Sequence, residues 1–242
     1  MITAGDIRSF TMRIATTIQL LLLIYPLLCL VAGCDRQTDL STRAAARPKS
    51  AAFTGTIVAV GNSLTAGLGV NEEEASPALL ENKLRSAGYQ WRVINAGISG
   101  ETSSGALARI TWVLKLKPDI VILETGANDG LRGVDPRLIL RNIDEIVSVF
   151  KENKVTVVLA GMRMLTNMGS EYTRAFAAVF PAIASKHGLV LIPFFLEGVA
   201  GEPDLNQADG LHPTAEGYRL VAETVYPYVV KAIDQRQQLL PN

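Results

Sequence analysis

The chain has 242 residues, of which 48% are hydrophobic and 19% are charged, and its formal net charge at pH 7 is zero. This length and composition fit one globular domain with a large core and exclude a chain that is disordered throughout. The balanced charge, with no run of lysine or arginine, gives no reason to predict a nucleic-acid-binding protein.

Residues 1–33 have the pattern of a secretory signal peptide and are left out of the fold prediction. Arg8 and Arg13 form a positive region, and a nearly unbroken apolar run follows from residue 18 to residue 31. This run is shorter than the ~20 residues with which a helix spans a bilayer. It gives way to small residues directly before Cys34, a pattern that looks like a bacterial lipobox.

We therefore predict that Cys34 is lipidated and anchors the protein in the bacterial cell envelope, facing the periplasm. An ordinary signal peptide and an uncleaved anchor are the alternatives. Asp35 resembles the signal that keeps some lipoproteins in the inner membrane, but this rule does not hold in all bacteria, so either membrane could carry the anchor. Cys29, the only other cysteine, lies in the predicted signal peptide. The mature chain would then have no cysteine nucleophile and no cysteine-ligated metal site.

Residues 34–53 are polar, lack an apolar period, and are expected to form the lipidated end and a flexible tether. Residues 54–242 show neither an internal repeat nor a second linker, so we predict one domain there. Within it, short β-branched runs alternate with longer helical patterns. The predicted strands are 56–60, 92–95, 120–124, 155–160 and 189–193.

The helix signals are clearest after the first strand and near the end of the chain. Residues 77–87 follow Ser76, a candidate cap, with Pro77 at the first helical position. Apolar residues recur at helical spacing over 139–150 and 218–229, and Pro227 is expected to kink or end the last helix. Because the strands are almost wholly apolar, they read as parallel strands covered on both faces. The pattern predicts a three-layer α/β/α sandwich with a mostly parallel five-stranded sheet, and a site at the carboxyl ends of its strands.

Chemically informative residues follow several of these strands. Ser63 comes directly after the first strand, where a helix start would stabilise developing negative charge, although a serine in this place is more often a helix cap. Gly100 lies in a glycine-rich turn after the second strand, which alone would be an ordinary βα turn. Asn128 follows the third strand and offers a neutral amide donor that suits an oxyanion.

The last motif joins an acid to a histidine. Asp209 and His212 lie three residues apart in a loop bounded by glycine and proline, so they can pair without long-range positioning. Asp129 is the competing acid for such a pair. His187, the only other histidine, lies near a predicted helix C-terminus, where a cation is favourable, and we predict that it is not catalytic. A serine, a histidine and an acid are the parts of a nucleophilic hydrolase.

Taken together, these four motifs resemble those of the SGNH hydrolases, also called the GDSL esterase/lipase family. Ser63, Gly100, Asn128 and His212 stand in the family's four blocks in the expected order. The resemblance covers roughly residues 56–228, and it is closest to the bacterial periplasmic branch of acyl-CoA thioesterases, lysophospholipases and arylesterases. It implies a flavodoxin-like SGNH hydrolase fold.

The same resemblance implies roles for these residues. Ser63 would be the nucleophile, His212 the general base and Asp209 the third member of a triad. An oxyanion hole would form from the backbone N–H groups of Ser63 and Gly100 and the side chain of Asn128. No metal and no organic cofactor would be required.

Two segments are expected to contact the substrate. Residues Asp129, Gly130 and Leu131 resemble part of a mobile substrate loop in the periplasmic branch. Met164 and Leu165, after the fourth strand, would line an acyl groove, because methionine adapts to irregular apolar ligands. Core packing of a βα loop is the alternative for Met164 and Leu165.

One residue departs from the family pattern. The first block usually reads Gly-Asp-Ser-Leu, whereas this chain has Asn62 in place of the aspartate. Asparagine keeps the size and the acceptor oxygen but loses the charge. We expect altered local hydrogen bonding and a shifted pH optimum, with the nucleophile retained.

The sequence thus predicts a serine esterase that hydrolyses acyl esters and thioesters through an acyl-enzyme. Its partners would be small acyl esters, thioesters or lysophospholipids, together with a membrane reached through the lipid anchor. A polysaccharide O-acetylesterase is the second enzyme hypothesis. A catalytically silent lipoprotein that binds acyl chains or glycans is the third, with Asn62 as the mark of lost activity.

Overall fold

The computed structural model describes residues 53–239 of the chain, and these belong to a compact unit spanning residues 51–242. The predicted signal peptide, Cys34 and almost all of the predicted tether lie outside the described residues. Five strands form one sheet in the order β2-β1-β3-β4-β5, and every neighbouring pair is parallel. The strands are β1 (Gly55–Gly61), β2 (Trp91–Gly97), β3 (Ile120–Glu124), β4 (Thr156–Ala160) and β5 (Val190–Ile192).

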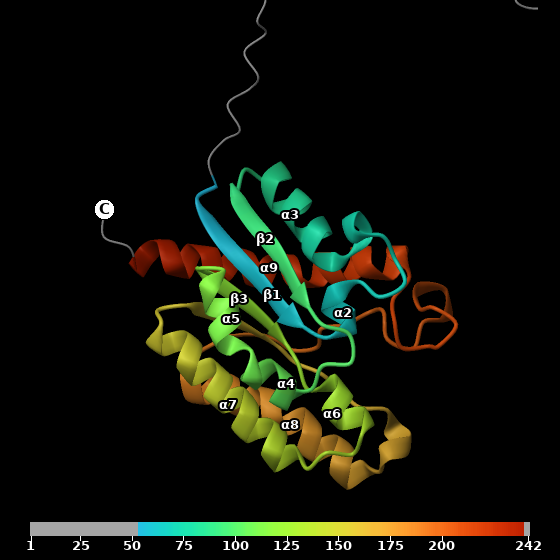
Figure 1. Cartoon of the computed structure of the whole chain (residues 1–242). Helices are drawn as coiled ribbons and strands as arrows, with labels where there is room; N and C mark the ends of the chain where they lie inside the picture. The colour runs from blue at the N-terminus through green and yellow to red at the C-terminus, as the bar shows by residue number, and fades with distance from the viewer. Residues whose placement is uncertain (1–52, 240–242) are drawn as a thin grey trace, which may run out of the picture. The chain divides into compact units, whose positions relative to one another are not determined.

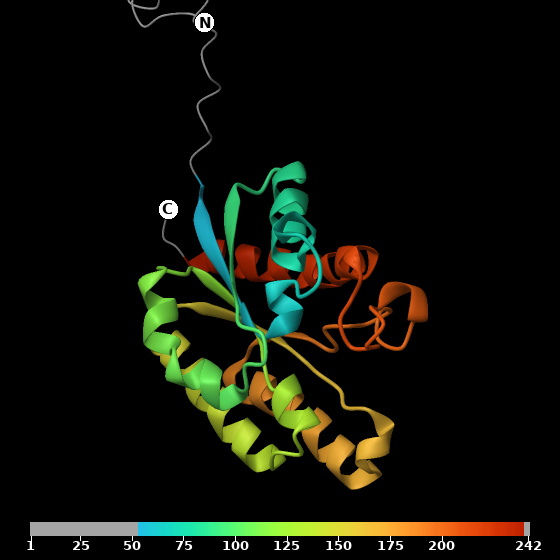
Figure 2. The ribbon, with the colours of Figure 1, turned by 45° about the vertical axis from the view of Figure 1, so that its right-hand side comes forward.

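Helices cover both faces of this sheet. In Figures 1 and 2, α3 and α9 lie on one face, and α4, α5, α7 and α8 lie on the other. The bounds of these helices are α3 (Ser76–Ser86), α4 (Ser103–Ala108), α5 (Ile110–Lys115), α7 (Pro136–Glu152), α8 (Ser170–His187) and α9 (Ala215–Leu239). The parallel sheet between two helical layers confirms the predicted three-layer fold and its flavodoxin-like strand order.

The core follows directly from the apolar pattern. All five residues of β3 are buried, as expected for a central strand with helices on both faces. The apolar stripe of α7 faces the sheet and buries Ile139, Ile143, Ile146 and Phe150 at helical spacing. This continuous core holds the strand ends, and therefore the loops that follow them, in fixed relative positions.

Two expectations about the start of α3 were wrong, and one of the two alternatives for Pro227 is excluded. Ser76 is the first residue of α3 and the cap is Ala75, without a side-chain hydrogen bond, so Ser76 does not cap the helix and Pro77 is its second residue, not its first. Helix α9 does not end at Pro227 but runs through it to Leu239, and a kink at the proline stays a prediction. Pro227 lies on the exposed side of the helix, while Val229, Ala232 and Ile233 beyond it are fully buried, and this burial favours continuing the helix past the proline.

The order of the strands reverses between β1 and β3. At such a point the loops after two neighbouring strands diverge to opposite faces of the sheet, which opens a crevice at their carboxyl ends. The short helices α2 (Ser63–Ala66) and α6 (Ala127–Leu131) follow β1 and β3 there. The candidate nucleophile and the candidate amide donor are therefore brought to the same place by the topology.

Candidate active site

The first turn of α2 presents Ser63. Asn62, not Ser63, is the cap of this helix, because its side-chain oxygen accepts a 2.9 Å hydrogen bond from the backbone N–H of Leu64. Ser63 is the first helical residue and is only 8% exposed. Its backbone N–H belongs to the first turn, where no intrahelical acceptor exists, so it is available to bind an anion.

His212 connects Ser63 to Asp209. The Nε2 atom of His212 lies 2.8 Å from Oγ of Ser63, and its Nδ1 atom lies 2.6 Å from Oδ2 of Asp209. With Nδ1 protonated, the ring donates to the carboxylate and turns its Nε2 lone pair toward the serine hydroxyl. The structure thus brings together the three residues that the sequence singled out as a triad, although 149 positions separate Ser63 from His212.

The carboxylate of Asp209 is held as an anion by its own loop. Hydrogen bonds from the His212 ring and from the backbone N–H groups of Leu211 and His212 lower the pKa of Asp209 from 3.8 to about 2. Gly210 adopts a left-handed backbone (φ 68°), which lets the loop turn back so tightly. Asp209 is therefore ionised throughout the pH range in which an imidazole titrates.

This loop is tied to the rest of the domain on both sides. The backbone N–H of Gln207 donates to the carbonyl of His212 at 2.7 Å, and the side chain of Gln207 donates to the carbonyl of Leu68 at 2.7 Å. The hydroxyl of Tyr218, which is fully buried, donates to the carbonyl of Ser63 at 3.3 Å. These bonds fix the distance between the loop and the nucleophile turn.

The loop after β2 carries Gly100, which has a left-handed backbone (φ 80°). Next to it, Glu101 is buried and paired with Arg109, whose Nε lies 2.6 Å from Oε1 of Glu101. The side chain of Asn128 donates a 3.0 Å hydrogen bond to the backbone carbonyl of Glu101. This bond joins the loops that carry Gly100 and Asn128. Donors to one oxyanion must be held close together, and the bond holds these two loops together.

Asp129 does not compete with Asp209. Its carboxylate is buried and accepts hydrogen bonds from the backbone N–H of Ser103 at 2.7 Å and from the Ser103 hydroxyl at 2.6 Å. Asn142 donates to the same hydroxyl at 2.9 Å. Asp129 therefore fastens α6 to α4 and faces away from the pocket, so the geometry does not support its assignment to substrate binding.

An apolar pocket of about 340 Å³ opens beside Ser63 and His212. Leu131, Met164 and Leu165, three of the expected substrate-contacting residues, line it, whereas Gly130 does not. Gly130 lies behind Met164, and a Cβ atom there would collide with the methionine sulfur. The apolar part of the lining comprises Leu64, Leu68, Ala127, Leu131, Met162, Met164, Leu165, Phe194, Leu196, Ala200 and Leu211.

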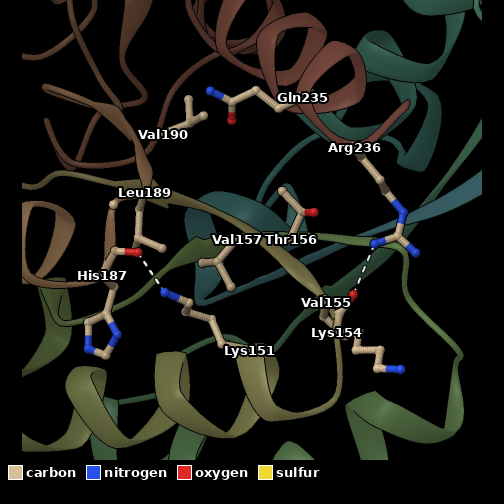
Figure 3. A pocket seen from close by; sticks show the side chains of 11 residues that line it. Lys151, Lys154, Val155, Thr156, Val157, His187, Leu189, Val190, Gln235 and Arg236 are labelled. Carbon is tan, nitrogen blue, oxygen red and sulfur yellow. Dashed lines mark hydrogen bonds between the residues drawn. The ribbon is translucent and has the colours of Figure 1, made fainter. Parts of the chain in front are cut away.

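A larger cavity, of about 500 Å³, lies at the opposite edge of the sheet (Figure 3). His187, in the last turn of α8, lines this cavity, and its Nε2 atom lies 2.7 Å from Oδ1 of Asp144. The pKa of Asp144 is lowered by its bonds to Lys186 and His187. Since no serine and no second acid face His187 in this lining, the cavity does not offer hydrolase chemistry.

The sequence analysis did not identify the role of one buried group. Glu124, at the end of β3, is fully buried and accepts hydrogen bonds from the backbone and side chain of Asn62 and from the Thr65 hydroxyl, at 2.6–3.1 Å. Burial raises the pKa of Glu124 from 4.5 to about 7, and the hydrogen bonds counteract part of this effect. A glutamate that ends an apolar run has no local signal for this contact, because its partners are 62 and 59 positions away.

Among residues 53–239, no cluster of three or more histidine, cysteine, aspartate or glutamate side chains is arranged to hold a metal ion. In the same part of the chain, no helix is both long and apolar enough to cross a membrane.

The fold and the site together define a serine hydrolase of the α/β class. Residues 59–220 match the GDSL-like lipase/acylhydrolase family, and the chain belongs to this family. It is similar to esterase TesA of Pseudomonas aeruginosa, with 38% identity over 82% of this chain and 95% of that protein. It is also 37% identical to thioesterase 1/protease 1/lysophospholipase L1 of Escherichia coli, over 72% of this chain and 82% of that protein.

Solved structures give the same result. A crystal structure of TesA superposes with a TM-score of 0.71 and 39% identity, and the match covers 73% of this chain and 99% of the TesA chain. The predicted family and fold are thereby confirmed, and the protein is a carboxylic ester hydrolase.

Proposed function

We propose that this hydrolase cleaves acyl esters and thioesters, including lysophospholipids, through an acyl-enzyme formed on Ser63. The observation that carries the proposal is the hydrogen-bonded row from Ser63 through His212 to Asp209 at the mouth of an apolar pocket. The names of the relatives, an esterase and a thioesterase/lysophospholipase, support the same substrate classes.

The chemistry follows from the geometry. His212 Nε2 takes the proton from Ser63 Oγ as that oxygen attacks the acyl carbonyl, and Asp209 stabilises the imidazolium that forms. The backbone N–H groups of Ser63 and Gly100 and the side-chain amide of Asn128 stabilise the tetrahedral oxyanion. The loss of one such donor typically lowers kcat by about 10²–10³-fold.

The second half of the cycle uses the same groups. His212 gives its proton to the leaving alcohol or thiol, and the ester bond to that group breaks. A water molecule then gives a proton to His212 and attacks the acyl-enzyme, which releases the carboxylic acid and restores Ser63.

The pocket favours an acyl chain over an acetyl group. Four leucines that line it, Leu68, Leu131, Leu165 and Leu211, are 38–50% exposed and form an apolar rim. Exposed apolar side chains gathered at a cleft indicate a surface that an apolar ligand covers. A polysaccharide O-acetyl group would leave this surface unused, so the O-acetylesterase alternative is less well supported.

We further propose that the protein works in the bacterial cell envelope, anchored through a lipid on Cys34 and facing the periplasm. The sequence before residue 53 supports this proposal, since an apolar run and small residues precede Cys34. Globomycin treatment of cells tests it, because a lipoprotein precursor should accumulate with an intact signal peptide. Unchanged processing would contradict lipidation.

Purified enzyme tests the activity on p-nitrophenyl esters of increasing chain length, acyl-CoAs, lysophospholipids and O-acetylated polysaccharide. We expect the highest kcat/KM on acyl chains longer than acetyl and no hydrolysis by a folded Ser63→Ala variant. Strict preference for acetyl groups would contradict the acyl-chain proposal, and near wild-type activity of Ser63→Ala would contradict the mechanism.

A further inference from the structure

The two edges of the sheet carry opposite charge. The segments at the amino ends of the strands, residues 84–92, 113–120, 149–156, 184–190 and 230–238, contain nine lysines and arginines and three acids. The segments at the carboxyl ends, residues 61–76, 97–103, 124–137, 160–171 and 193–216, contain three lysines and arginines and thirteen acids. A chain with a net charge of zero is therefore strongly polarised along its strands.

Helix dipoles explain a part of this distribution. The helices run opposite to the strands, so their C-termini, which favour cations, lie at the amino edge. The last turns of α3, α5, α7, α8 and α9 accordingly carry Arg85, Lys115, Lys151, Lys186 and Arg236.

Two lysines at this edge are not explained by helix dipoles alone. Lys117 (φ 53°) and Lys154 (φ 60°) are the two non-glycine residues with a left-handed backbone within residues 53–239. They follow the ends of α5 and α7, at positions where the ends of α3 and α8 have Gly88 and Gly188. Glycine adopts this backbone freely and lysine does not. The chain thus has lysine at two strained positions where glycine would fit better.

Three lysines of this edge are exposed to solvent and unpaired in the described part of the chain. Lys115, Lys117 and Lys154 are exposed and form no ion pair with any residue that the structure describes. Figure 3 shows Lys151 and Arg236 donating to the backbone carbonyls of His187 and Lys154, at 2.7 and 3.0 Å, around the cavity of this edge. The bond to a neutral carbonyl leaves the positive charge of Lys151 uncompensated, whereas Arg236 also pairs with Asp119 at 2.6 Å.

The same edge is where the preceding part of the chain joins the domain. The backbone N–H of Thr54, just before β1, donates to the carbonyl of Gln90 at 2.6 Å, and the guanidinium of Arg85 stacks over the Phe53 ring at 4.9 Å. The sequence between Cys34 and Phe53 adds four basic residues and two acids.

We propose that the amino edge of the sheet is a docking surface for a bilayer rich in anionic phospholipid headgroups. The surface comprises Lys115, Lys117, Lys151 and Lys154, which form no ion pair with any residue that the structure describes. They are flanked by Arg85 and Arg236, which pair with Glu81 and Asp119. Basic side chains near an anionic bilayer each contribute to binding. The acidic edge, which carries Ser63 and His212, then faces away from the bilayer, so substrate reaches the site from the aqueous side.

Sedimentation with vesicles tests the docking surface without the anchor. The domain from residue 51 is suited to this, because residues 51–242 form one compact unit. We expect it to bind vesicles of phosphatidylcholine and phosphatidylglycerol, to bind more weakly as salt rises, and to leave pure phosphatidylcholine vesicles unbound. Equal binding to both kinds of vesicle, or to neither, would overturn the proposal.

The decisive variant combines Lys117→Gly with Lys154→Gly. Glycine fits the left-handed backbone, so the melting temperature should not fall, while the partition coefficient on anionic vesicles should decrease by about 10- to 30-fold. Arg141→Gln with Arg174→Gln removes two exposed charges, neither in an ion pair with a described residue, nearer the opposite edge as a matched control and should bind like the wild type. All three proteins should hydrolyse a soluble p-nitrophenyl ester at equal rates.

Three results would contradict the proposed surface. The lysine variant could bind anionic vesicles as tightly as the wild type, or the control could weaken binding equally. Alternatively, the domain could bind soluble polyphosphate through these lysines while ignoring vesicles, which would assign the surface to another partner. None of these results would bear on hydrolysis at Ser63, so they are distinct from a failure of the proposed function.

Discussion

The side-chain amide of Asn62 donates a 2.6 Å hydrogen bond to Oε1 of Glu124 below the turn that carries Ser63. Glu124 accepts from three donors and donates to none, which is the pattern of a carboxylate. Gly61 makes this contact possible, since a Cβ atom there would overlap the Thr65 hydroxyl and lie 2.6 Å from Oε2 of Glu124. Where the family usually has an aspartate, Asn62 thus provides an amide donor to the buried carboxylate of Glu124.

Asn62→Asp should make stability strongly pH-dependent above neutrality. Two carboxylates this close cannot both ionise, so the native pair would retain a proton that the unfolded chain releases near its ordinary pKa. A native state that binds more protons than the unfolded state loses stability as pH rises. In the wild type the free energy of unfolding stops falling near the Glu124 pKa of about 7. In the variant it continues to fall above that pH, at about 1.4 kcal/mol per pH unit.

Urea unfolding at several pH values between 5 and 9 measures this difference. Asn62→Ala is the comparison variant, because it removes the amide without adding an acid. Since that amide lowers the pKa of Glu124, the loss of stability in Asn62→Ala should extend above pH 7, but less far than in Asn62→Asp. The interpretation fails if Asn62→Asp parallels the wild type above pH 7.

Asp209→Asn should lower kcat by about 10³–10⁴-fold while leaving KM nearly unchanged. The amide cannot stabilise the imidazolium and favours the wrong tautomer of His212. Because the pKa of Asp209 is about 2, protonation of this residue should not contribute to any acid-side loss of activity above about pH 4. Stopped-flow hydrolysis of a p-nitrophenyl ester checks the decrease, and a loss below tenfold would contradict the role of Asp209.

Arg109→Met should destabilise the domain by about 3–5 kcal/mol. It leaves the carboxylate of Glu101 buried without its 2.6 Å partner, and a buried unpaired charge is costly. Adding Glu101→Gln removes that charge and should restore much of the unfolding free energy. Chemical denaturation of the single and double variants measures the coupling, and strict additivity would show that the pair does not stabilise the loop next to Gly100.

Leu165→Ala should change acyl-chain selectivity with little effect on stability. Leu165 is 50% exposed and lines the pocket, so its truncation should lower kcat/KM for long-chain esters by about fivefold to tenfold and leave acetyl esters unaffected. Leu140→Ala is the control, since Leu140 is a 37% exposed leucine that does not line the pocket. Equal losses for acetyl and long-chain esters would contradict an acyl groove at Leu165.

The sequence predicted the sheet and the triad residues because their signals are local. Apolar runs locate strands, and a parallel α/β topology places whatever follows those strands at one edge. Glu124 and Asp129 could not be placed in this way, since their roles depend on Asn62, Thr65 and Ser103, which lie far away in the chain. Pro227 does not end α9, because the burial of residues beyond it outweighs its local helix-breaking preference.

The central claim is that Ser63 is the nucleophile activated by His212. Reaction with a fluorophosphonate probe followed by peptide mass spectrometry tests it most directly, because the probe forms a stable adduct only with an activated serine. We predict one adduct per chain, on the peptide that contains Ser63, and its loss in His212→Ala. An adduct on another serine, or full hydrolytic activity in a chain phosphonylated at Ser63, would contradict the account.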